Sequence, residues 1–167
     1  MSSPINYRIL EIQDSFEVRE YDNLLTAKVV VPGTFETGYR QGRELLMSYF
    51  NGENYKKVKI KYSPIYTLSS RVEGWEVSCV LPQQFNLLTL PRPIGENIRL
   101  EEIKSRHVAV NRFKGKLSYY DLMKKTEELK SWAQKVDLVL SKVERIAVYS
   151  SSFLSLIRNN EIQIDRI

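Results

Sequence analysis

The sequence is poor in the residues that form disulfides and most metal centres. Its 167 residues include one cysteine, Cys79, and one histidine, His107. A disulfide needs two cysteines, and the sequence has no cluster of His, Cys, Asp and Glu at metal-binding spacing. A single thiol and a single imidazole in distant segments also provide no nucleophile and base pair. These absences argue against a disulfide-rich secreted protein, a zinc protein and a thiol enzyme.

Long uncharged apolar runs are missing as well. No stretch approaches the roughly 20 residues that span a bilayer as a helix. Residues 1–6 lack the basic and then apolar pattern of a secretory signal. Phosphate-binding loops and dinucleotide-binding fingerprints are also absent. We therefore expect a cytoplasmic protein with no membrane contact.

Apolar and charged residues are plentiful. Hydrophobic residues make up 43% of the chain, enough for one domain with its own core, and we expect a single domain over residues 1–167. Lys and Arg number 25 and Asp and Glu number 20, for a formal net charge of +5. Because the basic residues are interspersed with acidic ones and accompany no nucleic-acid motif, we expect no nucleic-acid partner.

The first half of the chain predicts two strands, a helix and two further strands. The first strands are 16–21 and 24–31, after which Thr34 is placed to cap a helix that ends at Asn51-Gly52. Residues 57–62 alternate between lysine and apolar side chains, which predicts a strand with one solvated face. Residues 75–81 alternate in the same way, with Cys79 on the apolar side as a core thiol.

The second half repeats this order. Strands are predicted at 98–103 and 106–113, and Ser118 with Asp121 three residues later predicts the start of a helix. Two final strands, 143–149 and 161–167, complete the second half of the chain. A shift of 82 positions aligns the first parts of the repeats, which cover about 16–81 and 98–167. Two βαββ units of this kind predict an α+β fold with a pseudo-twofold axis, an antiparallel barrel or sandwich and two outer helices.

The connection between the last two strands is unusually apolar. Hairpin loops favour small polar residues, yet this one carries Phe153, Leu156 and Ile157. Large apolar groups in a connection either cover a core or line a binding place. Both interpretations stay open at the level of the sequence.

Seven short segments in order resemble the SOUL, or heme-binding protein, family. They are FEVREY at 16–21, YFNGEN at 49–54, KIKYSPI at 59–65, VLP at 80–82, PRP at 91–93, FKG at 113–115 and YSSSF with RNNE at 149–161. The resemblance covers nearly the whole chain. It implies a distorted eight-stranded antiparallel barrel flanked by two helices, related to gyrase-inhibitor-like bacterial effector-binding domains.

The resemblance also implies a ligand and a site. Family members bind heme and other tetrapyrroles in an apolar cleft between the first helix and the loop that joins the final two strands. The corresponding residues here are, on the helix, Arg43, Leu46, Met47 and Phe50, and on the loop, Phe153, Leu156 and Ile157. Arg43 or a lysine such as Lys57 would meet the porphyrin carboxylates. The early histidine that some members use for iron is absent, because the single histidine is His107, which we expect to be structural.

The expected activity is therefore non-catalytic binding of heme or another tetrapyrrole. Two alternatives use the same apolar loop: an effector-binding module for a different hydrophobic compound, and a protein-interaction domain. A small-molecule hydrolase is a further alternative, in which Glu20 and Glu102, paired by the repeat, would act as acid and base. Ion pairing with arginine neighbours such as Arg19 and Arg99 is the simpler role for these carboxylates.

Overall fold

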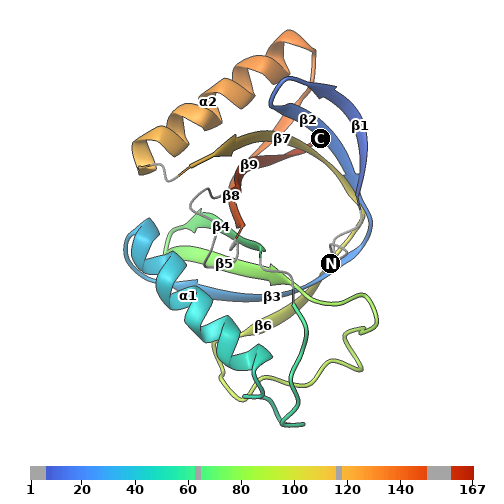
Figure 1. Cartoon of the computed structure of the whole chain (residues 1–167), viewed down its shortest axis with the longest axis vertical. Helices are drawn as coiled ribbons and strands as arrows, with labels where there is room; N and C mark the ends of the chain where they lie inside the picture. The colour runs from blue at the N-terminus through green and yellow to red at the C-terminus, as the bar shows by residue number, and fades with distance from the viewer. Residues whose placement is uncertain (1–6, 63–64, 116–117, 150–158) are drawn as a thin grey trace. The chain divides into compact units, whose positions relative to one another are not determined.

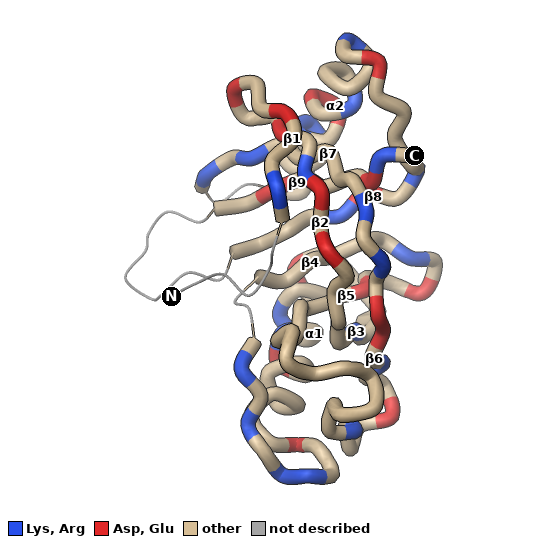
Figure 2. The backbone as a smooth tube through the Cα atoms, turned by 90° about the vertical axis from the view of Figure 1, so that its right-hand side faces the viewer, with Lys and Arg blue, Asp and Glu red and all other residues tan. Residues whose placement is uncertain are grey.

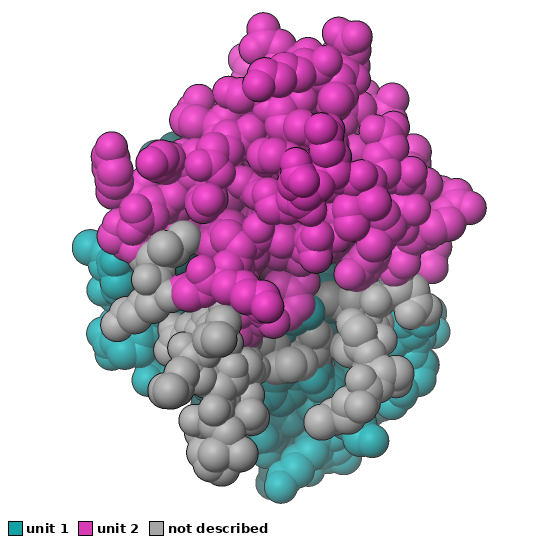
Figure 3. Space-filling model, turned by 45° about the horizontal axis from the view of Figure 1, so that its top comes forward, with its two compact units in different colours: residues 1–5, 23–104 teal, residues 6–22, 105–167 magenta. Residues whose placement is uncertain are grey.

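The computed structural model describes residues 7–62, 65–115, 118–149 and 159–167. These residues divide into two compact units, which are coloured separately in Figure 3. The first unit is built from residues 23–104, and the second from residues 6–22 and 105–167. The units do not follow the predicted repeats, because the strand at 16–21 belongs to the second unit and the strand at 99–103 to the first.

The first unit contains a four-stranded antiparallel sheet and one helix (Figure 1). Its elements are β3 (Leu24–Val31), α1 (Phe35–Phe50), β4 (Ile65–Arg71), β5 (Gly74–Val80) and β6 (Arg99–Ile103). The strands lie in the order β4-β5-β3-β6. Alternation along β5 buries Trp75, Val77 and Cys79, as the sequence predicted.

Helix α1 packs closely on β5 because two glycines face the strand. A Cβ atom on Gly38 would lie 2.8 Å from Cβ of Trp75, and one on Gly42 would lie 2.5 Å from Cγ2 of Val77. At the start of the helix, the Thr34 side chain accepts a hydrogen bond from the Thr37 N–H at 3.2 Å. The predicted cap and the predicted end at residues 51–52 are therefore confirmed.

The second unit contains a five-stranded antiparallel sheet and the second helix (Figure 1). Its elements are β1 (Tyr7–Gln13), β2 (Phe16–Tyr21), β7 (Arg106–Lys114), α2 (Tyr119–Lys135), β8 (Leu140–Tyr149) and β9 (Asn159–Arg166). The strands lie in the order β1-β2-β7-β9-β8. Helix α2 begins with the predicted capping box, in which Ser118 and Asp121 exchange side-chain and backbone hydrogen bonds.

Helix α2 covers the face of its sheet that carries the even-numbered residues of β2. Phe16 stacks on Trp132 with ring centroids 5.1 Å apart, and the Asn111 side-chain amide donates to the Lys125 carbonyl at 3.0 Å. The odd-numbered residues of β2 lie on the opposite face. One face of this sheet is therefore packed on α2, and the opposite face carries the polar side chains of Glu17, Arg19 and Tyr21.

The two sheets have equivalent strand orders. β4-β5-β3-β6 in one unit corresponds to β8-β9-β7-β2 in the other, and the first strand of each predicted repeat pairs within the opposite unit. Gly33 and Gly115, which the 82-residue shift aligns, both have positive φ, at 111° and 105°. The residue-by-residue correspondence of the repeats stays a prediction.

The number and the pairing of the strands differ from those of the expected barrel. The described residues form nine strands instead of eight, and no pairing between them joins the first and last strand of either unit's sheet, so neither unit is a closed barrel. The α+β class and the two helices are confirmed. β1 and β4 were not anticipated.

The predicted strand at 57–62 is wrong. The segment is an extended loop fixed by Asn54, whose side chain donates to the carbonyls of Tyr49 and Val58 at 3.2 and 2.8 Å. The N–H of Ile60 then donates to the Phe50 carbonyl at 2.8 Å, and Ile60 is buried. The alternation of lysine with apolar residues therefore does not mark one buried side, because Ile60 is buried while Val58 is 43% exposed.

Charges of both signs are distributed over both units. Figure 2 shows basic and acidic positions along most strands and loops. Many are paired locally, such as Glu76, whose carboxylate lies 3.1 Å from Arg71 and 3.6 Å from Lys28. This distribution agrees with the interspersed charges of the sequence.

Candidate functional site

The predicted helix residues lie in two different environments on α1. Leu46 and Phe50 are completely buried and belong to the core of the first unit. Arg43 and Met47 are half-buried, together with Tyr39 one turn earlier. Positions 39, 43 and 47 are spaced four apart and form a continuous stripe along one side of the helix, here called the α1 flank. Leu46 and Phe50 lie in the core beside this stripe, and their expected role in lining a cleft stays a prediction.

Aromatic rings border the α1 flank. Tyr39 makes an edge-to-face contact with Tyr66 of β4, with ring centroids 6.4 Å apart. At the far end of the helix, Phe50 stacks on Tyr62 with centroids 4.4 Å apart and an angle of 17° between the rings. Tyr66 and Phe50 are buried and hold Tyr39 and Tyr62 in place, and these two half-buried rings present flat apolar surface of the kind that planar ligands require.

Nε of Arg43, on the α1 flank, is shielded from solvent and has no hydrogen-bond partner among the described residues. The Tyr66 hydroxyl is also shielded, and its polar neighbours are Tyr62 and Arg43. Burial raises the pKa of Tyr66 well above its ordinary value, and Cys79 and Tyr62 raise it further, while the positive charge of Arg43 opposes the shift. A buried donor without a partner costs free energy, so an anionic group reaching Arg43 would satisfy it.

Of the other predicted ligand contacts, Lys57 is among the described residues and the three loop residues are not. Lys57 is exposed, has a positive φ of 53°, and its N–H donates to the Asn54 carbonyl at 2.9 Å. Phe153, Leu156 and Ile157 fall in 150–158, outside the described residues, so the opposite wall of the cleft stays a prediction. His107 belongs to β7 of the other unit, where its side chain is 41% exposed and lies 4.0 Å from Glu20.

The chemistry of these groups fits the porphyrin plate of heme better than its iron. The rings and the Met47 side chain offer apolar surface, and Arg43 offers a cation for a carboxylate. For iron, the described part of the α1 flank offers only the Met47 thioether and tyrosines. A tyrosine ligates iron as a phenolate, and burial disfavours that form of Tyr66. The first unit contains no histidine, because His107 is the only one in the sequence.

A buried ionic network, which the sequence analysis missed, lies on the helix-free face of the second unit's sheet. Arg19 is 1% exposed and donates to both carboxylate oxygens of Glu161 at 2.8 and 2.9 Å, to Glu17 at 2.6 Å and to the Tyr21 hydroxyl at 2.9 Å. Burial opposes the charge of Arg19, but the hydrogen bonds and attraction of Glu161 outweigh it and raise the pKa of Arg19. The expected pairing of Arg19 with Glu20 is replaced by this network, and Glu20 contacts Arg8 instead.

The acceptors of this network are also satisfied. Glu161 receives further hydrogen bonds from the Tyr149 hydroxyl at 2.7 Å and the Gln163 amide at 2.8 Å, and Glu17 lies 2.7 Å from Nε of Arg112. Burial raises the pKa of Tyr149, and that of Tyr21 to about 12. The segment FEVREY at 16–21 contains a signal for this network, because its two charged odd-numbered residues share a strand face with Tyr21. A fully satisfied cluster of this kind is a structural element.

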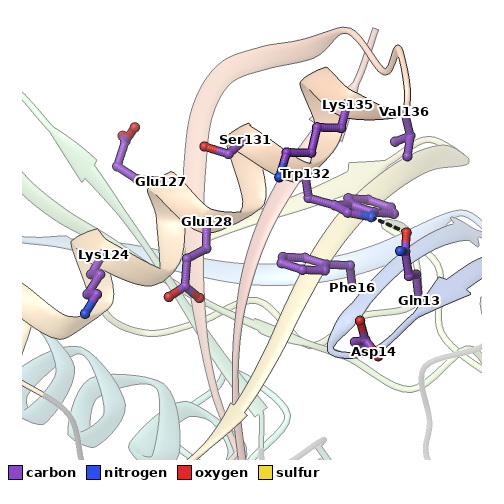
Figure 4. Close-up of a pocket in the computed structure, with 10 residues that line it drawn as sticks. All are labelled: Gln13, Asp14, Phe16, Lys124, Glu127, Glu128, Ser131, Trp132, Lys135 and Val136. Atoms are coloured by element: carbon purple, nitrogen blue, oxygen red, sulfur yellow. Dashed lines mark hydrogen bonds between the residues drawn. The ribbon is translucent and has the colours of Figure 1, made fainter.

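An open pocket of about 650 Å³ lies between α2 and the β1–β2 turn (Figure 4). The stacked pair of Phe16 and Trp132 forms its apolar wall, and the Trp132 indole N–H donates to the Gln13 side chain at 2.9 Å. Two of its acidic residues have basic partners on the helix: Glu128 lies 3.1 Å from Lys125, and Glu127 lies 3.6 Å from Lys130. The pocket therefore has less unsatisfied polar chemistry than the α1 flank.

The part of the chain that the structure describes contains neither a metal-binding cluster nor a membrane-spanning helix. No group of three or more His, Cys, Asp or Glu side chains there is arranged to hold a metal ion. Neither of the two helices there has the length and apolar character needed to cross a membrane.

Comparison with known proteins gives one family and a shared fold. The family model described as SOUL heme-binding protein matches residues 3–165. No curated protein sequence matches significantly. A hydrolase from Listeria innocua is similar in structure, with a TM-score of 0.68 and 8% identity over 95% of this chain and 94% of that one.

Two further solved structures are similar over most of their length. The EcmrR C-terminal domain has a TM-score of 0.61 and 15% identity, over 96% of this chain and 98% of that one. SAV2435 bound to tetraphenylphosphonium has a TM-score of 0.50 and 10% identity, over 91% and 93% of the two chains. At such low identity these likenesses establish the fold alone.

Proposed function

Because this chain belongs to the SOUL heme-binding protein family, we propose that it binds a tetrapyrrole, with the α1 flank as one wall of the site. The observation that carries the proposal is the unpartnered Nε of Arg43 within a half-buried, aromatic stripe. A tetrapyrrole is a flat apolar plate with carboxylates at one edge. The half-buried rings of Tyr39 and Tyr62 suit the plate, and the Arg43 guanidinium suits the carboxylate edge.

Binding in this proposal depends on the plate and its carboxylates and not on a bond to iron. Each 100 Å² of apolar surface removed from water contributes about 2.5 kcal/mol. A charge-assisted hydrogen bond to Arg43 contributes about 1.5–3 kcal/mol more. Heme, when bound, supplies a Lewis-acidic iron whose protein ligand here would be Met47 or none. Metal-free porphyrin should therefore bind about as tightly as hemin.

Arg43→Gln tests the role of the cation. Protoporphyrin IX, hemin and protoporphyrin dimethyl ester would each be titrated into the purified protein and followed by Soret absorbance and by quenching of protein fluorescence. We expect the substitution to weaken binding of the two free acids about tenfold or more and to leave the ester unaffected. Arg40→Gln is the matched control, because Arg40 lies on the same helix and is exposed.

Equal affinity of the variant and the parent for the free acids would contradict the role of Arg43. The failure of all three compounds to give saturable one-to-one binding would contradict tetrapyrrole binding itself. Met47→Ala separates plate binding from iron ligation, because it should alter the hemin spectrum only if the thioether contacts iron.

A second candidate ligand class is a bulky hydrophobic effector that is not a tetrapyrrole. The likeness to SAV2435 bound to tetraphenylphosphonium favours it, since that compound is an aromatic cation. The two classes respond oppositely to Arg43, because a cationic ligand is repelled by the guanidinium and an anionic one is attracted. Tetraphenylphosphonium binding that strengthens in Arg43→Gln would favour the effector alternative.

A further inference from the structure

β1 is an exposed apolar strand at the end of its sheet. It pairs with β2 on one side, and among the described residues no strand pairs with its other side. Figure 1 shows it as the outermost strand beside β2. Its apolar residues are between 37% and 60% exposed: Tyr7, Ile9, Leu10 and Ile12. An edge of this kind offers unpaired N–H and C=O groups together with apolar side chains, which favours pairing with another strand.

A β-bulge places the two charged residues of β1 on the same face. The register with β2 shifts between Ile9 and Glu11, so that Arg8 lies opposite Glu20 and Glu11 lies opposite Val18. Glu20 and Val18 are two apart on β2 and share a face. Arg8 and Glu11 therefore share a face as well, although residues three apart point in opposite directions along a regular strand.

We propose that this edge pairs antiparallel with β1 of a second copy of the chain, about a twofold axis between Ile9 and Leu10. In this register Arg8 of each copy lies opposite Glu11 of the other. Arg8 also contacts Glu20 of its own chain on that face, so each guanidinium would bridge Glu20 and the Glu11 of the other copy, which gives two reciprocal ion pairs. Tyr7 lies opposite Ile12, and both belong to the other face, because their β2 partners are Tyr21 and Glu17. Opposite charges and apolar pairs placed directly across strands are the favourable combinations.

The neighbouring registers do not have this complementarity. An axis through Leu10 would place Arg8 opposite Ile12, and an axis through Ile9 would place it opposite Leu10. Both put a charge against an apolar side chain and leave Glu11 without an opposite charge. The bulge therefore selects one register, because it alone matches the faces and the charges of both copies.

The residues of β1 indicate that the partner is a second copy of the chain. A second copy provides the same seven-residue strand, and its Arg8 and Glu11 complement each other when the strand is reversed. One added strand pair per copy is smaller than a standard protein interface, so association should depend on concentration. The proposal is independent of ligand binding, because neither β1 nor β2 contributes to the α1 flank.

Sedimentation velocity over a concentration series measures the association directly. We expect the parent protein to shift from monomer to dimer as concentration rises. Arg8→Glu alone and Glu11→Arg alone each create two like-charge pairs across the axis and should weaken the dimer about tenfold or more. The double variant Arg8→Glu with Glu11→Arg restores both ion pairs and should dimerise about tenfold more strongly than Arg8→Glu alone. Both variants carry the same new carboxylate beside Glu20, so their difference reports the pairing across the axis.

Mixing the two single variants gives a test of the register. In an equimolar mixture each Arg8→Glu chain can pair with a Glu11→Arg chain through two opposite-charge pairs, so dimer should reappear on mixing. Val72→Lys is the control, because it places a lysine at a fully exposed apolar position outside β1 and should leave the dimer unchanged. Thermal melting confirms that each variant remains folded.

Three results would overturn the proposal. The first is a parent protein that stays monomeric up to its solubility limit. The second is a dimer that is as strong in both single variants as in the parent, because the association would then use another surface or register. A dimer that both single variants weaken but that does not return in the mixture also contradicts the reciprocal pairing of Arg8 with Glu11.

Discussion

Removal of the Glu161 carboxylate should destabilise the second unit strongly. Glu161 is 4% exposed and accepts hydrogen bonds from Arg19, Tyr149 and Gln163. Glu161→Ala would leave the buried guanidinium with Glu17 as its only carboxylate neighbour. Breaking a buried ion pair from one side costs about 3–5 kcal/mol. For a chain of 167 residues, 1 kcal/mol lowers Tm by about 2–4 °C, so we expect a decrease of about 6–20 °C.

Urea unfolding followed by circular dichroism would measure this loss as a change in the free energy of unfolding. Combining Glu161→Leu with Arg19→Met should recover part of it, because the buried guanidinium is then removed as well, while Glu17 keeps its ion pair with Arg112. Glu127→Ala is the control, since the Glu127 side chain is 73% exposed and its loss should change stability by less than about 0.5 kcal/mol. A loss below about 1 kcal/mol for Glu161→Ala would refute the claim that the network is a buried, satisfied cluster.

Three further substitutions or conditions test the packing, the capping and the buried hydroxyls. Gly42→Ala should lower the free energy of unfolding, measured by thermal melting, by about 1–2 kcal/mol. The added methyl group meets Val77, and the gain in helix propensity offsets only part of the strain. Ser118→Ala should lower the free energy of unfolding by about 1 kcal/mol through loss of the capping box. Burial raises the pKa of Tyr21 and of Tyr49 to about 12, so the neutral hydroxyl is favoured in the folded state. Stability is therefore full below about pH 10 and falls as pH rises to about 12, by about 1.4 kcal/mol per pH unit for each tyrosine.

Each of these predictions has a contradicting outcome. Gly95→Ala is the control for Gly42, because no atom lies within 4 Å of its added Cβ, and equal effects at both sites would contradict tight packing of α1 on β5. An unchanged melting temperature for Ser118→Ala would show that α2 does not depend on its cap. Unfolding free energies that stay constant between about pH 10 and 12 would contradict the burial of the tyrosine hydroxyls.

The helices could be predicted from the sequence because their ends are encoded locally. Thr34 and the Ser118–Asp121 pair each satisfy backbone groups within one turn, so distant contacts do not alter their role. β5 could be predicted for a similar reason, since its alternation coincides with the buried side of one strand. The repeated order of strands and helices predicted the α+β class, which the observed elements confirm, and the match over residues 3–165 confirms the family resemblance.

The strands that were missed or wrong depend on contacts that a local pattern does not contain. β1 lacks alternation because its bulge places Ile9 and Leu10 in succession, so period two is interrupted. β4 contains Ser69 and Ser70, which resemble turn residues, yet Ser69 is buried in the sheet. The lysine alternation at 57–62 does not correspond to a strand, because Asn54 fixes the segment as a loop in which Ile60 is buried and Val58 is exposed.

The site was predictable in part. The family resemblance named Arg43 and Met47 together with Leu46 and Phe50, but it could not show that the first two are half-buried while the last two lie in the core. Nor could it show that Tyr66, a residue of the unpredicted β4, approaches Tyr39. Contacts between residues far apart in the sequence set these features, and they require the fold itself.

Titration of metal-free protoporphyrin IX into the parent protein and Arg43→Gln tests the central claim most directly. The compound keeps the plate and the carboxylates of heme but has no iron to ligate. The account predicts saturable one-to-one binding by the parent and about tenfold or weaker binding by the variant. Saturable binding of hemin with no binding of the metal-free porphyrin would contradict it, because recognition would then depend on an iron ligand and not on the α1 flank.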